Sequence, residues 1–198
     1  ANILAGNVKI NDELVTKAGA LFDENKLFDP EKPSKIEINS IPYVSRGGLK
    51  LKGAIDSFNI DLKGKICIDM GASTGGFTDC MLQAGAKFVY ALDVGYNQLA
   101  WKLRNDDRIK SIEKINVKNC TVEDVFSSND VELPSFMSMD LSFISIKKVL
   151  ENCKNLISSD AQAVLLIKPQ FEADREDIDK GGVVKSEKIR QKIIEDIK

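Results

Sequence analysis

Three charged side chains follow or flank apolar segments at positions where they could act together on a hydroxyl group. Lys50 lies on the polar side of an amphipathic segment, Asp140 ends the apolar run 135–140, and Lys168 ends the run 161–168. Two lysines close together in a partly dry cleft favour loss of a proton from one of them, and a carboxylate can orient the neutral amine. Each residue alone would equally be an ordinary charged end of a strand or helix.

A second group of residues, in the segment 65–78, has the pattern of a nucleotide-binding loop. An apolar run ends at Asp69 and is followed by small residues and then by a helical pattern. Glycines let a backbone approach a ligand closely, and the start of a helix offers free N–H groups. A tight turn in some other α/β protein would have the same composition.

The glycine spacing of this loop limits the class of ligand that it could bind. Gly71-x-x-x-Gly75-Gly76 lacks the G-x-G-x-x-G of dinucleotide-binding proteins and the Gly-Lys-Ser/Thr of phosphate loops. It therefore disfavours a nicotinamide-dependent dehydrogenase and favours an adenosine ligand without phosphates, of which S-adenosylmethionine is the common one. Asp93, at the end of the run 87–93, suits the two ribose hydroxyls of such an adenosine. With this cofactor, the lysines and Asp140 predict methyl transfer to a ribose hydroxyl, mainly by aligning oxygen, methyl carbon and sulfur.

The elements that must position these residues alternate between strands and helices. This order predicts βαβ units and an α/β fold, a Rossmann-like parallel sheet with helices on both faces. The expected strands are 65–69, 87–93, 109–115, 135–140 and 161–168, and the expected helices are 45–58, 77–84, 98–103, 122–126, 145–156 and one that begins at Ser186. Before them, Asn11-Asp12 predicts a hairpin and Ile36–Ile38 a further strand, in a segment with too few apolar residues for its own core.

Composition excludes some chemistry and leaves the partner open. The 198 residues contain 28 Lys and Arg, 30 Asp and Glu, and no histidine, so the commonest general base and metal ligand is absent, and we predict no metal. The four cysteines are far apart in sequence, as in reduced proteins of the cytoplasm, and no segment has the length of a membrane span. Basic residues at 147–148 and 185–192 could face RNA phosphates or simply form solvated helix surfaces.

Five motifs in this sequence, taken in order, resemble the TlyA (hemolysin A) family, whose members are FtsJ-like ribosomal RNA 2′-O-methyltransferases. The resemblance covers nearly the whole chain. Its motifs are Tyr43-Val44-Ser45-Arg46-Gly47-Gly48-Leu49-Lys50-Leu51, the loop 69–78, Met139-Asp140-Leu141-Ser142-Phe143-Ile144-Ser145, Ile167-Lys168-Pro169-Gln170-Phe171-Glu172, and Lys180-Gly181-Gly182-Val183-Val184.

The resemblance implies S-adenosylmethionine as cofactor, ribosomal RNA or ribosomal subunits as partner, and cytidine ribose as substrate. Lys50, Asp140 and Lys168 match the first three members of the family's Lys-Asp-Lys-Glu catalytic tetrad. The cofactor-binding positions that it implies are Ser45, Arg46 and Gly47 near the methionine end, Asp69, Gly71, Ala72, Ser73, Gly75, Gly76 and Phe77 in the loop, Asp93 at the ribose, and Asn116 at the adenine end.

The resemblance also implies two domains, a partial S4-like α+β RNA-binding segment over 1–39 and an FtsJ-like methyltransferase domain over 40–198. Two family features have no counterpart, an Arg-rich first helix and the Glu that completes the tetrad; Glu172 belongs to another motif and does not fill that role. We therefore expect a chain truncated at both ends, nearly inactive alone. The alternatives are a non-catalytic RNA-binding protein that retains the cofactor fold, and a membrane-active hemolysin, which the absence of a basic amphipathic helix disfavours.

Overall fold

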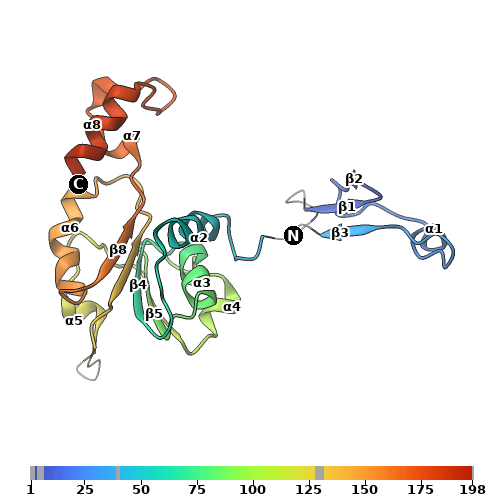
Figure 1. The fold of residues 1–198 in the computed structure, drawn as a ribbon, viewed down its shortest axis with the longest axis horizontal. Helices are drawn as coiled ribbons and strands as arrows, with labels where there is room; N and C mark the ends of the chain where they lie inside the picture. The colour runs from blue at the N-terminus through green and yellow to red at the C-terminus, as the bar shows by residue number, and fades with distance from the viewer. Residues whose placement is uncertain (1–2, 4–6, 39–40, 128–131, 198) are drawn as a thin grey trace. The chain divides into compact units, whose positions relative to one another are not determined.

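The computed structural model describes residues 3, 7–38, 41–127 and 132–197. The chain divides into two compact units, Ala1–Pro42 and Tyr43–Lys198, and each has its own β-sheet (Figure 1). The linker predicted around Asn39 to Pro42 falls partly outside the described residues, because 39 and 40 are not among them.

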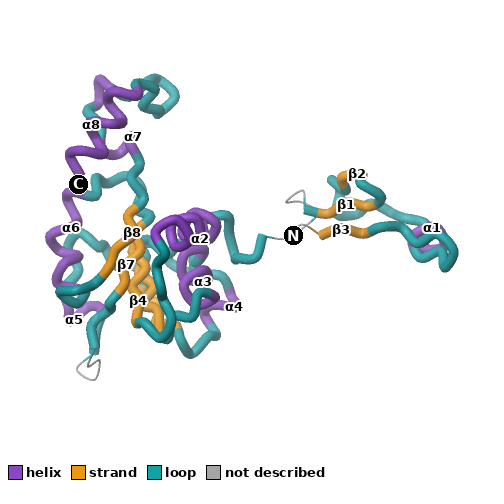
Figure 2. The backbone as a smooth tube through the Cα atoms, viewed as in Figure 1, coloured by secondary structure: helices purple, strands orange, loops and turns teal. Residues whose placement is uncertain are grey.

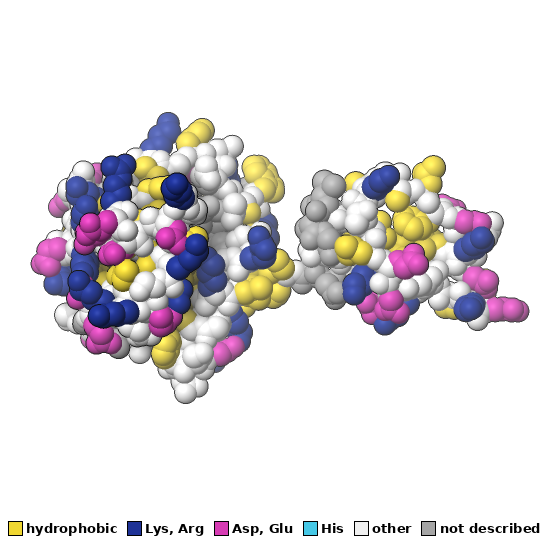
Figure 3. All heavy atoms as spheres, turned by 90° about the horizontal axis from the view of Figure 1, so that it is seen from above, with side chains coloured by type: hydrophobic (Ala, Val, Ile, Leu, Met, Phe, Trp, Pro, Cys, Tyr) yellow, Lys and Arg dark blue, Asp and Glu magenta, His cyan; other side chains and the backbone are white. Residues whose placement is uncertain are grey.

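The N-terminal unit is a small antiparallel sheet with the strand order β2-β1-β3. Its elements are β1 (Val8–Ile10), β2 (Glu13–Leu14), α1 (Glu24–Leu27) and β3 (Ile36–Ile38). The predicted hairpin is confirmed, since Asn11 and Asp12 both have positive φ, 51° and 68°, as a tight turn between twisted strands requires. Val15 is the one buried hydrophobic residue among those described here, and apolar side chains are visible over the middle of this unit (Figure 3).

The C-terminal unit is the predicted α/β fold, a five-stranded parallel sheet with helices on both faces (Figure 2). The strand order is β6-β5-β4-β7-β8. The strands are β4 (Ile66–Met70), β5 (Phe88–Leu92), β6 (Ile109–Ile112), β7 (Phe136–Met139) and β8 (Gln162–Leu165). The helices are α2 (Gly47–Phe58), α3 (Gly76–Gln83), α4 (Trp101–Arg104), α5 (Val122–Val125), α6 (Lys147–Cys153), α7 (Pro169–Glu172) and α8 (Glu187–Ile197), with short 3-10 turns at Lys154–Leu156 and Arg175–Asp177.

Alternating side chains of the central strands fill two hydrophobic layers. Cys67 of β4 packs with Leu51 of α2 and Phe77 of α3 on one face of the sheet. Ile68, the next residue, packs on the other face with Val149 of α6. This alternation is what a strand buried on both faces requires, and it fixes the side to which each polar residue of the strand points.

Several predicted boundaries are wrong, for local reasons. The strand expected over 109–115 ends at Ile112, and Lys114 two residues later has a φ of 58°, which no strand tolerates. The helix expected over 98–103 is confined to Trp101–Arg104. The helix expected over 45–58 begins at Gly47, and its N-cap is Arg46, which makes no side-chain hydrogen bond there. Phe58, the last residue of α2, is 73% exposed.

The strand order reverses between β4 and β7, and the carboxyl ends of these two strands lie side by side. Such a switch point is the usual ligand site of an open parallel sheet. Gly71 follows β4 with a φ of 85°, and a Cβ atom there would lie 2.9 Å from the carbonyl oxygen of Asp140. Glycine at 71 therefore permits both the turn and the close approach of the two strand ends.

We expect Gly71→Ala to lower the free energy of unfolding by about 2–4 kcal/mol, combining positive-φ strain with overpacking against Asp140. The matched control is Gly64→Ala, because Gly64 also has a positive φ, 73°, but open space around its Cβ position. The control should lose only about 1 kcal/mol. Urea unfolding measures both, and equal losses would show that the close approach at Gly71 has no energetic weight.

Candidate active site

Lys50, Asp140 and Lys168 come together at the switch point, as their places at strand and helix ends predicted. Lys50 Nζ lies 3.1 Å from Asp140 Oδ2, and Lys168 Nζ lies 2.6 Å from Asp140 Oδ1. The three residues belong to α2, to the end of β7 and to the segment after β8. One carboxylate thus holds two ammonium groups on opposite sides.

The two lysines differ in their surroundings. The side chain of Lys50 is 52% exposed, whereas that of Lys168 is 20% exposed and also donates to Ser142 Oγ at 2.8 Å. Lys168 precedes Pro169, the first residue of α7, so its backbone is held in an extended conformation. Lys168 is therefore the more rigidly placed of the two amines.

Two cavities surround this cluster and share part of their walls. One, of about 240 Å³, contains Lys50 and Lys168; the other, of about 440 Å³, contains Asp93 and Asn116. Their common lining residues are Gly71, Ser73, Asp140 and Ser142. The smaller cavity is also lined by Ser45, Gly47, Ala72, Thr74, Gly76 and Phe77. The carboxyl ends of β4 and β7 therefore divide one cleft into a lysine side and an Asp93 side.

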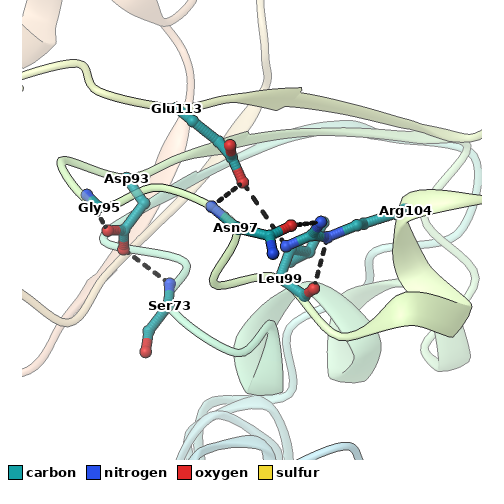
Figure 4. Close-up of polar contacts among 7 residues, drawn as sticks. All are labelled: Ser73, Asp93, Gly95, Asn97, Leu99, Arg104 and Glu113. Carbon is teal, nitrogen blue, oxygen red and sulfur yellow. Dashed lines mark hydrogen bonds and ion pairs between the residues drawn. The ribbon is translucent and has the colours of Figure 1, made fainter.

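Asp93 anchors the loop that follows β4. Its Oδ2 accepts a hydrogen bond from Ser73 N at 2.7 Å, and its Oδ1 accepts one from Gly95 N at 2.7 Å (Figure 4). Each carboxylate oxygen has a second lone pair, which leaves acceptor capacity for a ligand hydroxyl. Asn116 lines the same cavity and its Oδ1 accepts from Lys118 N, so its amide N–H₂ group is turned away from that turn.

The glycines of the loop are packed against protein. A Cβ at Gly75, where φ is 94°, would lie 2.3 Å from Leu103 and 2.7 Å from Leu99. A Cβ at Gly76 would lie 2.3 Å from Ser45 Oγ. The sequence predicts that these glycines let the backbone approach a ligand, but Gly75 and Gly76 are needed first to make room for neighbouring protein segments.

Asp69 lies beneath the loop and lines neither cavity. It is fully buried and accepts hydrogen bonds from Thr78 Oγ1 at 2.6 Å and Ser138 Oγ at 2.9 Å. Burial raises the pKa of this carboxyl to about 6, and the two hydroxyl donors offset part of the rise. Asp69 therefore joins β4, α3 and β7 below the cleft.

Of the remaining predicted positions, some line the cleft and others do not. Ser45 and Gly47 line the smaller cavity, whereas Arg46 lines neither of the two. Glu172, which the sequence kept out of the catalytic group, accepts from Ser145 Oγ at 2.6 Å and from Ile146 N at 2.8 Å. Both of its oxygens are thus held at the start of α6.

Two residues of the site were not singled out from the sequence. Ser142 bonds Lys168, and Phe143 lies on the wall of the larger cavity with 91% of its surface exposed. The ring of Phe143 is 5.2 Å from that of Phe171, and its φ is 65°, an uncommon value for a bulky residue. Their place directly after Asp140, in the loop beyond a strand end, was the available signal.

Comparison with known proteins identifies the domain that carries this cleft. Residues 43–198 match the model of the FtsJ-like methyltransferase family. The chain belongs to this family. The match begins at Tyr43, the first residue of the C-terminal unit, so the family's domain and the compact unit coincide.

Individual relatives refine the membership. Hemolysin A of Brachyspira hyodysenteriae is 47% identical over 97% of this chain and 75% of its own length. YqxC of Bacillus subtilis, whose name assigns it provisionally to the rRNA methyltransferases, is 43% identical over 97% of this chain and 65% of its own length. The 16S/23S rRNA (cytidine-2′-O)-methyltransferase TlyA of Mycobacterium tuberculosis is 44% identical over 77% of this chain and 55% of its own length. The predicted TlyA (hemolysin A) resemblance is confirmed, and the chain spans between half and three quarters of these relatives.

Two solved structures support the same family membership. A protein from Streptococcus thermophilus named as a hemolysin is 43% identical, with a TM-score of 0.77 over 99% of this chain and 68% of its own. A second such protein, from Lactococcus lactis, is 47% identical, with a TM-score of 0.74 over 80% of this chain and 74% of its own. In this FtsJ-like domain, the described cleft combines a carboxylate beside the loop, a backbone of small residues, and two lysines at the far side.

We expect the buried carboxyl of Asp69 to make stability depend on pH in a direction opposite to that of most acids. The folded state keeps its proton up to about pH 6, whereas the unfolded chain loses it near pH 3.8, so this group stabilises the fold less as the pH rises between these values. Relative to Asp69→Asn, the wild type should lose up to about 3 kcal/mol between pH 4 and pH 8.

Urea unfolding of both proteins across this range measures the difference. Asp106→Asn is the control, because Arg108 lowers the pKa of Asp106 and the difference from wild type should stay constant above about pH 5. A pH-independent difference for Asp69→Asn would mean that this carboxyl is ionised throughout.

Proposed function

We propose that this protein transfers a methyl group from S-adenosylmethionine to the ribose 2′-hydroxyl of cytidine in ribosomal RNA. The observation that carries the proposal is the Lys50–Asp140–Lys168 cluster at one side of a cleft whose other side has Asp93 beside a glycine-rich loop. The names of the Mycobacterium relative and of the Campylobacter jejuni TlyA, a 23S rRNA (cytidine-2′-O)-methyltransferase, support the substrate.

Each side of the cleft has a distinct part in this function. When bound, S-adenosylmethionine supplies an electrophilic methyl group on its sulfonium. Asp93, with Asn116 in the same cavity, holds the adenosine side, and the backbone around Ser45, Gly47 and Gly71 borders the methionine side. The smaller cavity then receives the ribose hydroxyl beside Lys168.

We assign to Lys168 the role of general base, which takes the proton of the ribose hydroxyl. Its amine, in the neutral form, accepts the proton as the ribose oxygen forms its bond to carbon, and the sulfur keeps the electron pair of the broken bond. Asp140 and Ser142 fix the direction of that amine, at 2.6 Å and 2.8 Å. Lys50 bonds the other oxygen of Asp140 and keeps the carboxylate from turning. Most of the rate gain comes from alignment, to which these fixed contacts contribute.

The N-terminal unit takes a separate part in the proposal. We infer that residues 1–39 form part of an S4-like RNA-binding domain, which would bring the RNA to the methyltransferase domain. A small antiparallel sheet with little buried core supports an element that works in contact with a larger partner.

Within the residues that the structure describes, no helix combines the length and the apolar composition of a membrane span. A non-catalytic RNA-binding protein remains the competing function, and the experiment below separates it from a methyltransferase.

The test is a map of 2′-O-methyl groups in ribosomal RNA of the source organism with and without the gene. Deletion should remove methylation at one or more cytidines, and the wild-type gene should restore it. Lys168→Ala should restore little or none, because general-base groups contribute about 10²- to 10⁴-fold to rate. The matched control, Lys154→Ala, removes an exposed lysine paired with Glu151 and should restore methylation fully.

Protein levels of all variants are compared by immunoblot, and their affinity for S-adenosylmethionine by calorimetry. Full methylation with Lys168→Ala at equal protein level would contradict the assigned mechanism. An unchanged methylation map after deletion would favour the non-catalytic function.

A further inference from the structure

The segment between β5 and α4, residues 93–100, forms one border of the Asp93 side of the cleft and is attached to the glycine-rich loop at both of its ends. At its start, Asp93 accepts from Ser73 N. At its end, Ala100 N donates to Thr74 O at 3.1 Å, and the buried Leu99 packs where a Cβ of Gly75 would be. The two loops are therefore held to each other at both ends of this segment.

The middle of this segment has no hydrophobic anchor. Val94 and Tyr96 are 71% and 67% exposed, and Asn97 is in the left-handed region with a φ of 58°. A non-glycine residue adopts this conformation only where other contacts hold it. Those contacts come from Arg104 and Glu113, which Figure 4 shows beside Asn97.

Arg104 of α4 and Glu113, just after β6, supply the contacts. Arg104 donates from Nε to Leu99 O at 2.7 Å and from Nη1 to the side-chain oxygen of Asn97. Glu113 Oε1 accepts from Asn97 N at 3.0 Å and lies 3.9 Å from Arg104 Nη2 (Figure 4). Arg104 thus holds the side chain of Asn97, and Glu113 holds its backbone N–H.

Neither Arg104 nor Glu113 lines the two cavities of the cleft. Their side chains are 26% and 23% exposed, so most of the Arg104–Glu113 pair is shielded from water. A shielded arginine that satisfies a backbone carbonyl and a side-chain amide has a fixed direction, which an exposed ion pair lacks. The contacts of this pair are to the loop, and through the loop to Asp93 and Ser73.

We propose that Arg104 and Glu113 are positioning residues for cofactor binding: they hold segment 93–100 in its bound shape, so that Asp93 and Ser73 need no ordering when the adenosine enters. This inference rests on the proposed function, because it takes the Asp93 side of the cleft as the adenosine side. Without the pair, the exposed middle of the segment gains conformations, and binding must remove them.

The free-energy cost of ordering segment 93–100 should weaken cofactor binding and leave the rate of the methyl-transfer step unchanged. Arg104→Gln should raise the Kd for S-adenosylhomocysteine by about 5- to 30-fold, and should raise the Kd for 5′-methylthioadenosine, which shares the adenosine but lacks the amino-acid end, by the same factor. The matched control is Arg108→Gln, since Arg108 pairs with Asp106 and lines neither cavity. It should leave both Kd values within about twofold of wild type.

A spectroscopic signature separates positioning from general loss of structure. The chain has a single tryptophan, Trp101, which begins α4 beside the segment and is 78% exposed. Its fluorescence emission should respond to ligand in the wild type and in Arg108→Gln, with the response reached at higher ligand concentration in Arg104→Gln. Thermal unfolding is measured in parallel on the same proteins.

Glu113→Ala is the second variant, in case Arg104→Gln does not fold. It removes the acceptor for Asn97 N and should raise both Kd values by about threefold or more. Wild-type affinity in folded Arg104→Gln or Glu113→Ala overturns the inference, as does a rise for S-adenosylhomocysteine without one for 5′-methylthioadenosine. Absence of binding by the wild type itself overturns the proposed function, so the two failures are distinct.

Discussion

The candidate site depends on one carboxylate, Asp140, that is held between two lysines. Its side chain is 18% exposed and its Oδ1 is fully shielded, a position that is costly for an ionised group unless cations lie close by. Lys168 and Lys50 supply these cations, one at each carboxylate oxygen of Asp140. Removing either lysine would leave one oxygen of Asp140 without its cationic partner, so the placement of each member of the cluster depends on the others.

The parallel sheet creates this position. Asp140 N donates to Met70 O at 3.1 Å, which ties the end of β7 to the end of β4, and Gly71 leaves room for the carbonyl of Asp140. Because Gly71, Ser73, Asp140 and Ser142 line both cavities, the lysine side and the Asp93 side adjoin each other. Asp69 secures the same two strands and α3 from below. The residues that we propose for catalysis and for cofactor binding therefore share one support, the ends of β4 and β7.

Much of this could be predicted from the sequence, because strand ends in a parallel sheet must meet. The predicted neighbours Lys50, Asp140 and Lys168 are in contact, and Asp93 lies beside the loop. What could not be predicted depends on backbone conformation or tertiary pairing. For example, no periodic pattern in the sequence indicates that Asn97 has a left-handed backbone or that Arg104 and Glu113 bond to it.

Other differences have the same origin. The strand expected over the apolar run 161–168 is β8, which lies at the edge of the described sheet, where Gln162 and Ala163 are exposed. Hydrophobicity alone does not distinguish an edge strand that borders an apolar surface, here with Phe58 and Ile60, from a central one. Arg46 starts a helix beside the cavity without lining it, since adjacent residues of a helix start point in different directions.

A crystal structure of the protein with S-adenosylhomocysteine tests the central claim most directly. The account predicts the adenosine in the cavity lined by Asp93 and Asn116, its ribose hydroxyls at Asp93, and the sulfur facing the cavity that contains Lys50, Asp140 and Lys168. Ligand bound in the opposite direction, or bound away from the ends of β4 and β7, would contradict it.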